Sequence, residues 1–307
     1  MMYIIVNPKS RTGKGLQIWK EARTILKKNH IAFKAYATKY KGHATKLAEQ
    51  ITSLSDDEIC RGVVGGDGTV NEVINGIRDF SKVWFGVVPT GSGNDFARGL
   101  QMKGDTAYYV GRIMDGTKMR MMDLGRVTWD DCEKPRYFAI SSGIGMDAIV
   151  CKKALTSKQK EVLNKLHHGK LTYLLLTVET LFSMETANIK ACLDGKNTKL
   201  FDKLIFAAAM NFRAEGGGVP MAPNADSEDG KLSMCFAYGI PKWLTFFVLP
   251  FLVLAKHEMF SCFSIEDFRD CHIQLDRPVV LHADGEYLGD VMDVRFECVP
   301  KALKIMI

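Results

Sequence analysis

The sequence predicts a two-domain protein, with an α/β N-terminal domain built on a mainly parallel sheet with flanking helices and a β-rich antiparallel second domain. The first 125 or so residues alternate strand signals with helical stripes of apolar side chains, which is typical of a parallel sheet covered by helices. From about Asp123 onward, runs with period-two alternation replace that pattern. A chain of 307 residues is long enough for both domains,. We expect them at 1–125 and 126–295.

The N-terminal domain is expected to contain four strand–helix units. Apolar runs predict the strands, and apolar side chains at helical spacing predict the helices between them. Parallel strands need such crossover connections, so the repeated βα order indicates a parallel sheet. The predicted strands are 3–6, 33–37, 62–64 and 84–88, and the predicted helices are 13–28, 44–54, one from Val70 and one through 96–100.

The second domain is expected to be dominated by antiparallel strands. Its apolar residues alternate with polar ones, and turn residues separate the runs, which is typical of strands with one buried face. The predicted strands are 136–140, 187–193, 204–210, 231–236 and 272–275.

The stretch 65–72, GGDGTVNE, follows a buried strand and leads into a helix. Its three glycines would allow positive φ and a close backbone approach to a ligand. Asp67 and Thr69 would add a carboxylate and a hydroxyl at the tip of the turn, and the helix N-terminus would face the same spot. An ordinary strand-to-helix turn is the alternative, but the polar residues favour a phosphate site. The candidate nucleotide ligands here are Gly65, Gly66, Asp67, Gly68, Thr69, Asn71 and Glu72.

A second glycine-rich turn follows the next strand, at Thr90, Gly91, Ser92, Gly93 and Asn94. Both turns follow the carboxyl end of a strand, which is where open parallel sheets bind ligands. Neither turn has the Gly-Lys-Ser/Thr of a Walker A loop or the Gly-x-Gly-x-x-Gly dinucleotide fingerprint,. The sequence therefore indicates phosphate chemistry of another kind.

Together, GGDGT-N-E at 65–72 and PTGSGNDFAR at 89–98 resemble the diacylglycerol kinase catalytic domain, in its soluble bacterial lipid kinase branch. Sphingosine and ceramide kinases share this domain. NAD kinases and phosphofructokinases carry blocks like GGDGT, whereas the second block, with Asn94, Asp95 and Arg98, is more specific. The resemblance runs from Asn7 to Glu286.

The resemblance implies an ATP-dependent kinase acting on the hydroxyl of diacylglycerol or a related lipid, with Mg²⁺ as cofactor. It also implies a β-sandwich in the second domain, with the tail 296–307 returning to the first. An NAD-kinase-like enzyme and a catalytically inactive lipid-binding regulatory protein are the alternatives.

Phosphoryl transfer needs a phosphate cradle, Mg²⁺ and a group that orients the attacking hydroxyl. Asn7 ends the first strand at the same sheet edge as the glycine turns, and Lys9 could reach phosphate oxygens, although a surface cation is the default reading. The resemblance places a nucleotide-contacting threonine at Thr38. It also assigns the proton acceptor to Asp284 or Glu286, without deciding between them.

A type I′ turn would also account for Asp284-Gly285. The flanks of this triplet differ from the family pattern, because His282-Ala283 precede it. We expect His282 to be a turn residue beside the site.

Two groups of acidic residues are candidates for Mg²⁺, which prefers oxygen ligands and keeps several waters. The acidic turn 226–232 could equally be a solvated turn. The resemblance assigns a structural Mg²⁺ to Asp229, with the backbone carbonyls of Asp226 and Lys231. Asp67, Asp95 and Asp123 remain as candidates for the catalytic Mg²⁺.

Charge and hydropathy indicate which partners and surfaces the protein would bind. The net charge of +6 suits an anionic partner such as a nucleotide or an acidic membrane surface,. The basic segment 152–170 could meet headgroups or be a solvated helix face. The apolar segment 243–255 is too short to span a bilayer, which takes about 20 residues. It is either a core helix or an interfacial one, and we favour the latter.

Eight cysteines without a C-x-x-C pair argue against a zinc site and a disulfide framework,. The N-terminus opens directly into a strand, so we expect no signal peptide. We expect a cytoplasmic protein, peripheral at the inner membrane face, with ATP and a lipid as partners and no nucleic acid. A homodimer is compatible with the sequence.

Overall fold

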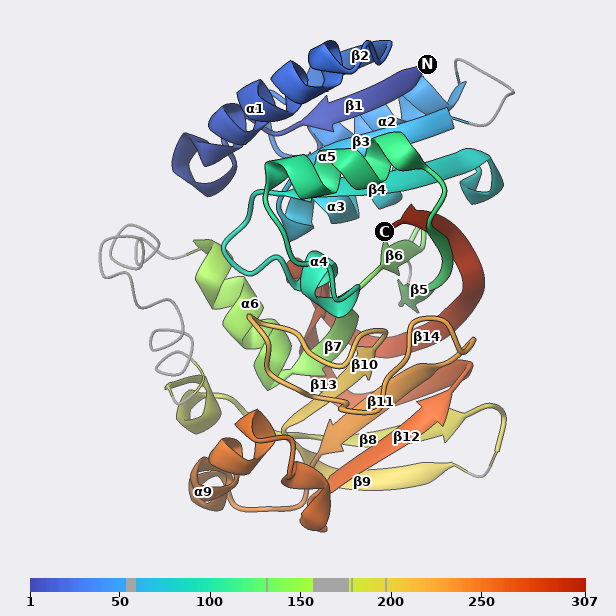
Figure 1. Ribbon diagram of the computed structural model, residues 1–307. Coiled ribbons are helices and arrows are strands. Elements are labelled where there is room, and N and C mark those ends of the chain that lie inside the picture. Colours follow the sequence, from blue (N-terminus) through green and yellow to red (C-terminus); the bar gives the residue numbers. More distant parts are fainter. Residues whose placement is uncertain (54–58, 131, 157–176, 178, 197) are drawn as a thin grey trace. The chain divides into compact units, whose positions relative to one another are not determined.

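The computed structural model describes residues 1–53, 59–130, 132–156, 177, 179–196 and 198–307 (Figure 1). The chain forms two compact units. The first contains Met1–Leu124 and Val299–Ile307, and the second contains Gly125–Cys298. Most of the basic segment 152–170 lies outside the described residues.

The first unit is built on a parallel sheet in the order β14-β4-β3-β1-β2. Buried aliphatic side chains on β1, β3 and β4 form its centre, as expected for parallel strands that are covered on both faces. The strands are β1 (Met2–Val6), β2 (Phe33–Ala37), β3 (Ile59–Gly65), β4 (Val83–Pro89) and the end of β14 (Glu286–Met306).

Helices cover this sheet, with α1 packed beside α5 and α2 beside α3 (Figure 1). Each carries an apolar stripe at helical spacing, and that stripe is what it buries,. The helices are α1 (Lys14–Lys28), α2 (His43–Ser53), α3 (Asp67–Ile74), α4 (Asp95–Gly99) and α5 (Thr106–Asp115). Short 3₁₀ turns occur at Ser10–Gly13 and Phe80–Lys82. The predicted α/β architecture is confirmed.

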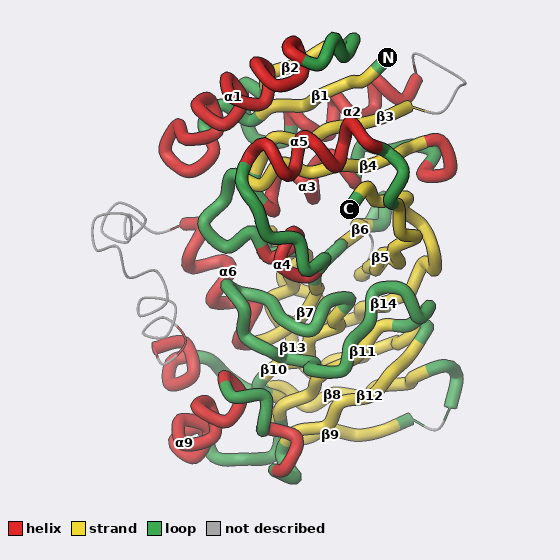
Figure 2. Tube along the Cα trace, viewed as in Figure 1, coloured by secondary structure: helices red, strands yellow, loops and turns green. Residues whose placement is uncertain are grey.

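The second unit consists mostly of strands (Figure 2), and neighbouring strands in it pair antiparallel. Its strands run in the order β12-β11-β10-β7-β13-β14, with β8 and β9 extending from β13. β5 pairs with β14 and β6. The additional elements are β5 (Met119–Trp129), β6 (Arg136–Phe138), β7 (Ser141–Gly145), β8 (Ala187–Leu193), β9 (Lys199–Leu204), β10 (Phe206–Met210), β11 (Leu232–Ala237), β12 (Phe263–Phe268), β13 (Asp270–Ala283), α6 (Met146–Thr156), α9 (Lys242–Val253) and the 3₁₀ turn His257–Met259.

β10 and β11 differ from the expectation of one buried and one solvated face, because every residue of both strands is buried. Alternate residues enter two separate cores. Ala207 and Ala209 of β10 join a core with Phe236, whereas Phe206 and Ala208 join a second, methionine-rich core. α9 covers that second core with Val248, Leu249 and Leu252.

The opposite face of α9 is apolar and exposed. Trp243 is 59% exposed and Phe247 62% exposed, and Phe246 and Leu244 are also at the surface. The helix therefore has a core face and an exposed apolar face, so neither sequence alternative describes it completely. Among the described residues, no helix is long and apolar enough to cross a membrane.

Candidate active site

The two glycine turns meet at the carboxyl ends of β3 and β4. These strands pair in parallel up to Gly65 and Pro89, and the N–H of Thr90 donates to the carbonyl of Gly65 at 2.9 Å. A Cβ on Gly66 would lie 3.2 Å from the Cα of Gly91. Glycine is therefore needed because the two backbones touch.

The expected positive φ angles at these glycines are not found. Gly66 has φ −90°, and none of Gly65, Gly68, Gly91 and Gly93 lies in the left-handed region. Asn94 does, with φ 51°. The glycines thus serve close packing rather than an unusual backbone: a Cβ on Gly65 would lie 2.6 Å from the Cβ of Thr69.

The position expected for Asp67 and Thr69 also needs correction. α3 begins at Asp67, so both residues lie in its first turn and not at the tip of the preceding turn. The N-cap of α3 is Gly66, which has no side chain to satisfy the first N–H groups of the helix,. Such a helix start favours an anion.

Polar side chains connect three strand ends at this edge. Asn7, after β1, donates from Nδ2 to Thr69 Oγ1 at 3.0 Å. Ser10 Oγ donates to the Asn7 carbonyl at 2.8 Å and therefore accepts from Thr90 Oγ1 at 2.7 Å. Ser10 was missed by the sequence reasoning, although a hydroxyl three residues after Asn7 was the available signal.

Asp67 links the two turns. Its Oδ2 accepts from the N–H of Asp95 and its Oδ1 from the N–H of Phe96, both at 3.1 Å. It thus caps the N-terminus of α4, whose own N-cap side chain makes no such bond. Asp95 is paired with Arg98. A Cβ on Gly93 would lie 3.3 Å from Asp95 Oδ2 and 3.6 Å from Asp67 Oδ2, so this glycine leaves space beside both carboxylates.

Asn94 presents an unsatisfied group in the second turn. Its Oδ1 is buried and has no hydrogen-bond partner within the described part of the chain. A buried polar atom normally has a partner. A ligand or water at this turn would supply one. Ser92, in the same turn, is exposed.

Other predicted nucleotide ligands have structural contacts. The carboxylate of Glu72 accepts the N–H groups of Gly42 at 2.8 Å and Ala44 at 3.1 Å, and so holds the start of α2. Asn71 is fully buried. Thr38 donates its N–H to the Val6 carbonyl at 2.8 Å and continues the pairing of β1 and β2.

Lys9 is exposed, and its backbone N–H donates to Asn7 Oδ1 at 3.2 Å. Asp123 is buried in β5, where it accepts the N–H of Lys301 at 2.6 Å. Of the three carboxylates predicted for the catalytic Mg²⁺, the structure brings Asp67 and Asp95 together beside Gly93.

In the second unit, Asp284 and Gly285 form the two-residue turn between β13 and β14. Their φ angles are 46° and 80°, as a type I′ hairpin turn requires,. The Asp284 carboxylate accepts three backbone N–H groups, from Ala139 at 2.9 Å, Ile140 at 2.8 Å and Ser141 at 3.1 Å. Such bonds favour the ionised form and weaken a carboxylate as a base. Glu286, the other predicted acceptor, follows the turn as the first residue of β14.

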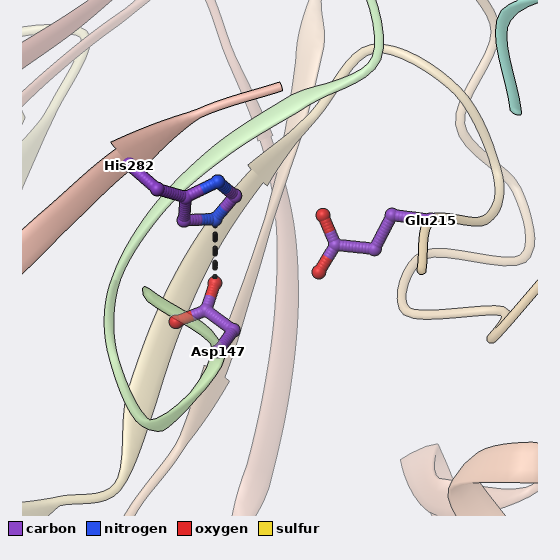
Figure 3. Close-up of side chains that lie close together, drawn as sticks. All are labelled: Asp147, Glu215 and His282. Atoms are coloured by element: carbon purple, nitrogen blue, oxygen red, sulfur yellow. Dashed lines mark hydrogen bonds and ion pairs between the residues drawn. The ribbon is translucent and has the colours of Figure 1, made fainter. Parts of the chain in front are cut away.

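His282 is not the turn residue that the sequence suggested. It lies in β13 and is 1% exposed, with Nε2 3.1 Å from Asp147 Oδ2 (Figure 3). Burial disfavours the charged ring, but the hydrogen bond and charge of Asp147 outweigh burial and raise the pKa of His282. Glu215 and Asp284 act in the same direction.

Asp147, Glu215 and His282 offer donor atoms that all lie within 4.8 Å of one another (Figure 3). The imidazole argues against a metal ion here. Its Nδ1 accepts the N–H of Gly285 at 3.2 Å, so Nε2 must carry the proton of a neutral ring. A metal ion would need the Nε2 lone pair.

The acidic turn at 226–231 is tightly folded. Asp226 Oδ1 accepts the N–H of Glu228, and Asp229 Oδ1 accepts that of Lys231. Desolvation and the neighbouring carboxylates of Asp226 and Asp267 raise the pKa of Asp229. A cation would relieve this repulsion, and the oxygen donors suit Mg²⁺.

Comparison with known proteins covers most of the chain. Residues 1–127 match the diacylglycerol kinase catalytic domain. Residues 140–307 match the YegS C-terminal NAD kinase beta sandwich-like domain. This second match agrees with the expected sandwich-like second domain.

Curated relatives are similar over most of their length. A Bacillus subtilis protein named "Putative lipid kinase YtlR" is 28% identical over 305 residues, covering 99% of this chain and 98% of that protein. A diacylglycerol kinase of Staphylococcus carnosus is 27% identical, covering 94% and 89%. A crystal structure titled as a putative diacylglycerol kinase from Bacillus anthracis superposes with a TM-score of 0.77 at 21% identity, covering 99% and 94%. It shows the same fold.

Proposed function

The chain belongs to the family of lipid kinases that carry a diacylglycerol kinase catalytic domain and a YegS-type C-terminal domain, and we propose that it is an ATP-dependent kinase of diacylglycerol or a related lipid. Its product would be phosphatidic acid or the corresponding lipid phosphate. The names of its relatives support this reaction class.

The observation that carries the proposal is the contact between the two glycine turns. They meet at the carboxyl edge of a parallel sheet, beside the start of α3, whose N-cap glycine has no side chain, and beside the buried Oδ1 of Asn94, which has no hydrogen-bond partner among the described residues. The backbone N–H groups at this helix start can bind an anion. The Asn94 Oδ1 is an acceptor, so it would take a hydroxyl of the ligand, a water or a cation rather than a phosphate oxygen. We assign this site to the phosphates of ATP. Asn7 and Thr69 would hold the edge of the site in place, and Lys9 would reach the phosphates from the surface.

Mg²⁺ fits the carboxylate pair beside Gly93. Asp67 and Asp95 direct their Oδ2 atoms to the same side of this glycine, and Mg²⁺ is commonly held by one or two carboxylates together with substrate phosphates. Bound there, the ion would neutralise charge that develops on the transferred phosphoryl group. A second, structural Mg²⁺ is assigned to Asp229 with the carbonyls of Asp226 and Lys231. Glu286 is assigned as the group that accepts the lipid hydroxyl proton.

The exposed face of α9 is assigned to the membrane surface. Its side chains include Trp243, Phe246 and Phe247, and the exposed Lys256 lies three residues after its last residue, Val253. An exposed aromatic face suits the interface of a bilayer. Docking there would give access to a lipid that resides in the bilayer, and we place the protein at the inner face of the cytoplasmic membrane.

The test is phosphate transfer from radiolabelled ATP to diacylglycerol, monoacylglycerol, sphingosine, phosphatidylglycerol and NAD in parallel. Labelling of a glycerolipid is expected. Labelling of NAD alone would replace the proposal with an NAD-kinase reaction, and ATP binding without any labelled product would favour an inactive lipid-binding protein.

Two alanine variants connect the activity to the glycine turns. Gly66→Ala would force the turns apart, because its Cβ would come within 3.2 Å of Gly91, and it should weaken ATP binding. Gly111→Ala in α5 is the matched control, since its Cβ would meet no atom within 4 Å.

A further inference from the structure

His282 is fixed by hydrogen bonds at both ring nitrogens. Nδ1 accepts the N–H of Gly285 at 3.2 Å, and Nε2 donates to Asp147 Oδ2 at 3.1 Å. The ring is almost completely buried. Its backbone carbonyl accepts from the hydroxyl of Ser142. The imidazole is therefore a rigid connection between the start of α6 and the turn that follows β13.

Asp147 is itself held in position to support this ring. Its side chain is 8% exposed, and it fits because residue 143 is glycine: a Cβ on Gly143 would lie 2.2 Å from Asp147 Oδ2. The carboxylate of Glu215 points toward the His282–Asp147 pair (Figure 3) and is hydrogen-bonded to the hydroxyl of Ser141. The buried carboxylate of Asp147 needs a hydrogen-bond donor, and Nε2 of His282 supplies one.

The turn is thus anchored at both of its residues. The Asp284 carboxylate holds three N–H groups at 139–141, and His282 holds the N–H of Gly285. Glu286 follows immediately and pairs with Ala283 across the hairpin. Because Gly285 has φ 80° and no side chain of its own, an external contact is what limits its movement.

We propose that His282 is a positioning residue, which fixes Gly285 through Nδ1 and thereby directs the carboxylate of Glu286 toward the hydroxyl that it deprotonates. This rests on the proposed function. A base must lie within hydrogen-bond reach of its proton, so a small displacement of Glu286 lowers kcat. Asp147 selects the ring tautomer that leaves Nδ1 able to accept, because a carboxylate bound to one ring nitrogen fixes the proton there.

Two amide variants separate the two ends of the ring. His282→Asn keeps an oxygen near the Nδ1 position and loses the contact to Asp147. His282→Gln keeps a donor near the Nε2 position and loses the acceptor for Gly285. His272→Asn is the control, because His272 lies in the same strand and pairs with Asp293 2.9 Å away, but does not contact the turn.

With the lipid acceptor found for the wild type, His282→Gln should lower kcat at least tenfold while KM for ATP and for lipid stays within about twofold. His282→Asn should retain most of kcat, and the control should retain all of it. Full kcat in His282→Gln would overturn the proposal. Equal losses of kcat in His282→Gln and His282→Asn that parallel their losses of thermal stability would also overturn it.

Amide hydrogen exchange at Gly285 tests the contact without any activity. The Gly285 N–H should be protected in the wild type and in His282→Asn, and should exchange at least tenfold faster in His282→Gln. Unchanged exchange would refute the role of His282. Loss of protection together with a wild type that labels no acceptor would instead refute the proposed function.

Discussion

Replacing Asp284 should mainly lower stability, whereas replacing Glu286 should mainly lower activity. Asp284→Asn keeps one oxygen, which can still accept the N–H groups of Ile140 and Ser141, but turns an amide NH₂ toward the N–H of Ala139. One hydrogen bond to a charged group is lost, and a buried donor is left unpaired. Hydrogen bonds to charged groups contribute about 1.5–3 kcal/mol each, so we expect a loss of about 2–4 kcal/mol.

For a unit of this size, that loss lowers Tm by about 5–15 °C. Glu286→Gln is nearly isosteric and should change stability by less than about 1 kcal/mol. It should instead reduce kcat by about 10² or more, with ATP binding preserved. Differential scanning fluorimetry and initial-rate lipid phosphorylation measure the two effects on the same samples.

The reasoning would be refuted by the reverse pattern. If Asp284→Asn melts with the wild type yet loses kcat, while Glu286→Gln retains it, then Asp284 is the base and its three backbone contacts do not prevent proton transfer. Measuring kcat well below each variant's Tm keeps unfolding from imitating a catalytic loss.

Three further variants address the metal sites and the membrane, and a fourth addresses pH. Asp67→Ala should abolish transfer and also cost about 1 kcal/mol of stability through the lost α4 cap, so an active variant would remove Asp67 from the mechanism. Mg²⁺ should raise the Tm of the wild type but not that of Asp229→Asn, because ligand binding to the native state stabilises it; a wild-type Tm that does not change with Mg²⁺ would exclude the site. Replacing Trp243 and Phe247 by serine should reduce sedimentation of the protein with phosphatidylglycerol vesicles at unchanged Tm. If the variant binds the vesicles as well as the wild type does, the α9 face is not the membrane-docking surface. Because the hydrogen bond and charge of Asp147 raise the pKa of His282, the charged pair stabilises the fold below about pH 6.5, and this contribution is lost as pH rises through the folded-state pKa. The difference in unfolding free energy between wild type and His282→Asn should therefore be larger at pH 6 than at pH 9. Protonation also places a hydrogen on Nδ1, so the Gly285 contact belongs to the neutral ring and is measured above that pKa,.

Local patterns were enough to predict some of the elements and the two glycine turns, whereas β5, β9, β12, β14, α5 and α6 were not predicted. Apolar runs and helical stripes depend on neighbours in sequence, and β2 and β8 have the predicted bounds. β10 shows where the pattern was misread. Its residues 206–210 are an unbroken apolar run, which indicates a strand buried on both faces rather than one with a solvated face. Here the signal was present in the sequence.

Contacts between distant residues could not be predicted in the same way. Asp67 caps α4 by accepting N–H groups that lie 28 and 29 positions later in the sequence, and Asp147 is hydrogen-bonded to His282, which lies 135 positions later. Sequence offers a carboxylate in a turn and a histidine before an Asp-Gly pair, but not their partners. The role of Asp67 as a cap, beside its proposed role with Mg²⁺, therefore became visible only in the fold.

The Asp-Gly-Glu triplet shows why a motif alone left the base undecided. Either carboxylate could serve by chemical type, and a type I′ turn explains the first two residues without any catalysis. The hairpin divides their roles. With φ 46°, Asp284 directs its carboxylate back to the N–H groups at 139–141, and those bonds stabilise its charge. Glu286 resumes extended structure one residue later. The turn thus fixes the carboxylate of Asp284 and gives rigid support to Glu286, the proposed proton acceptor.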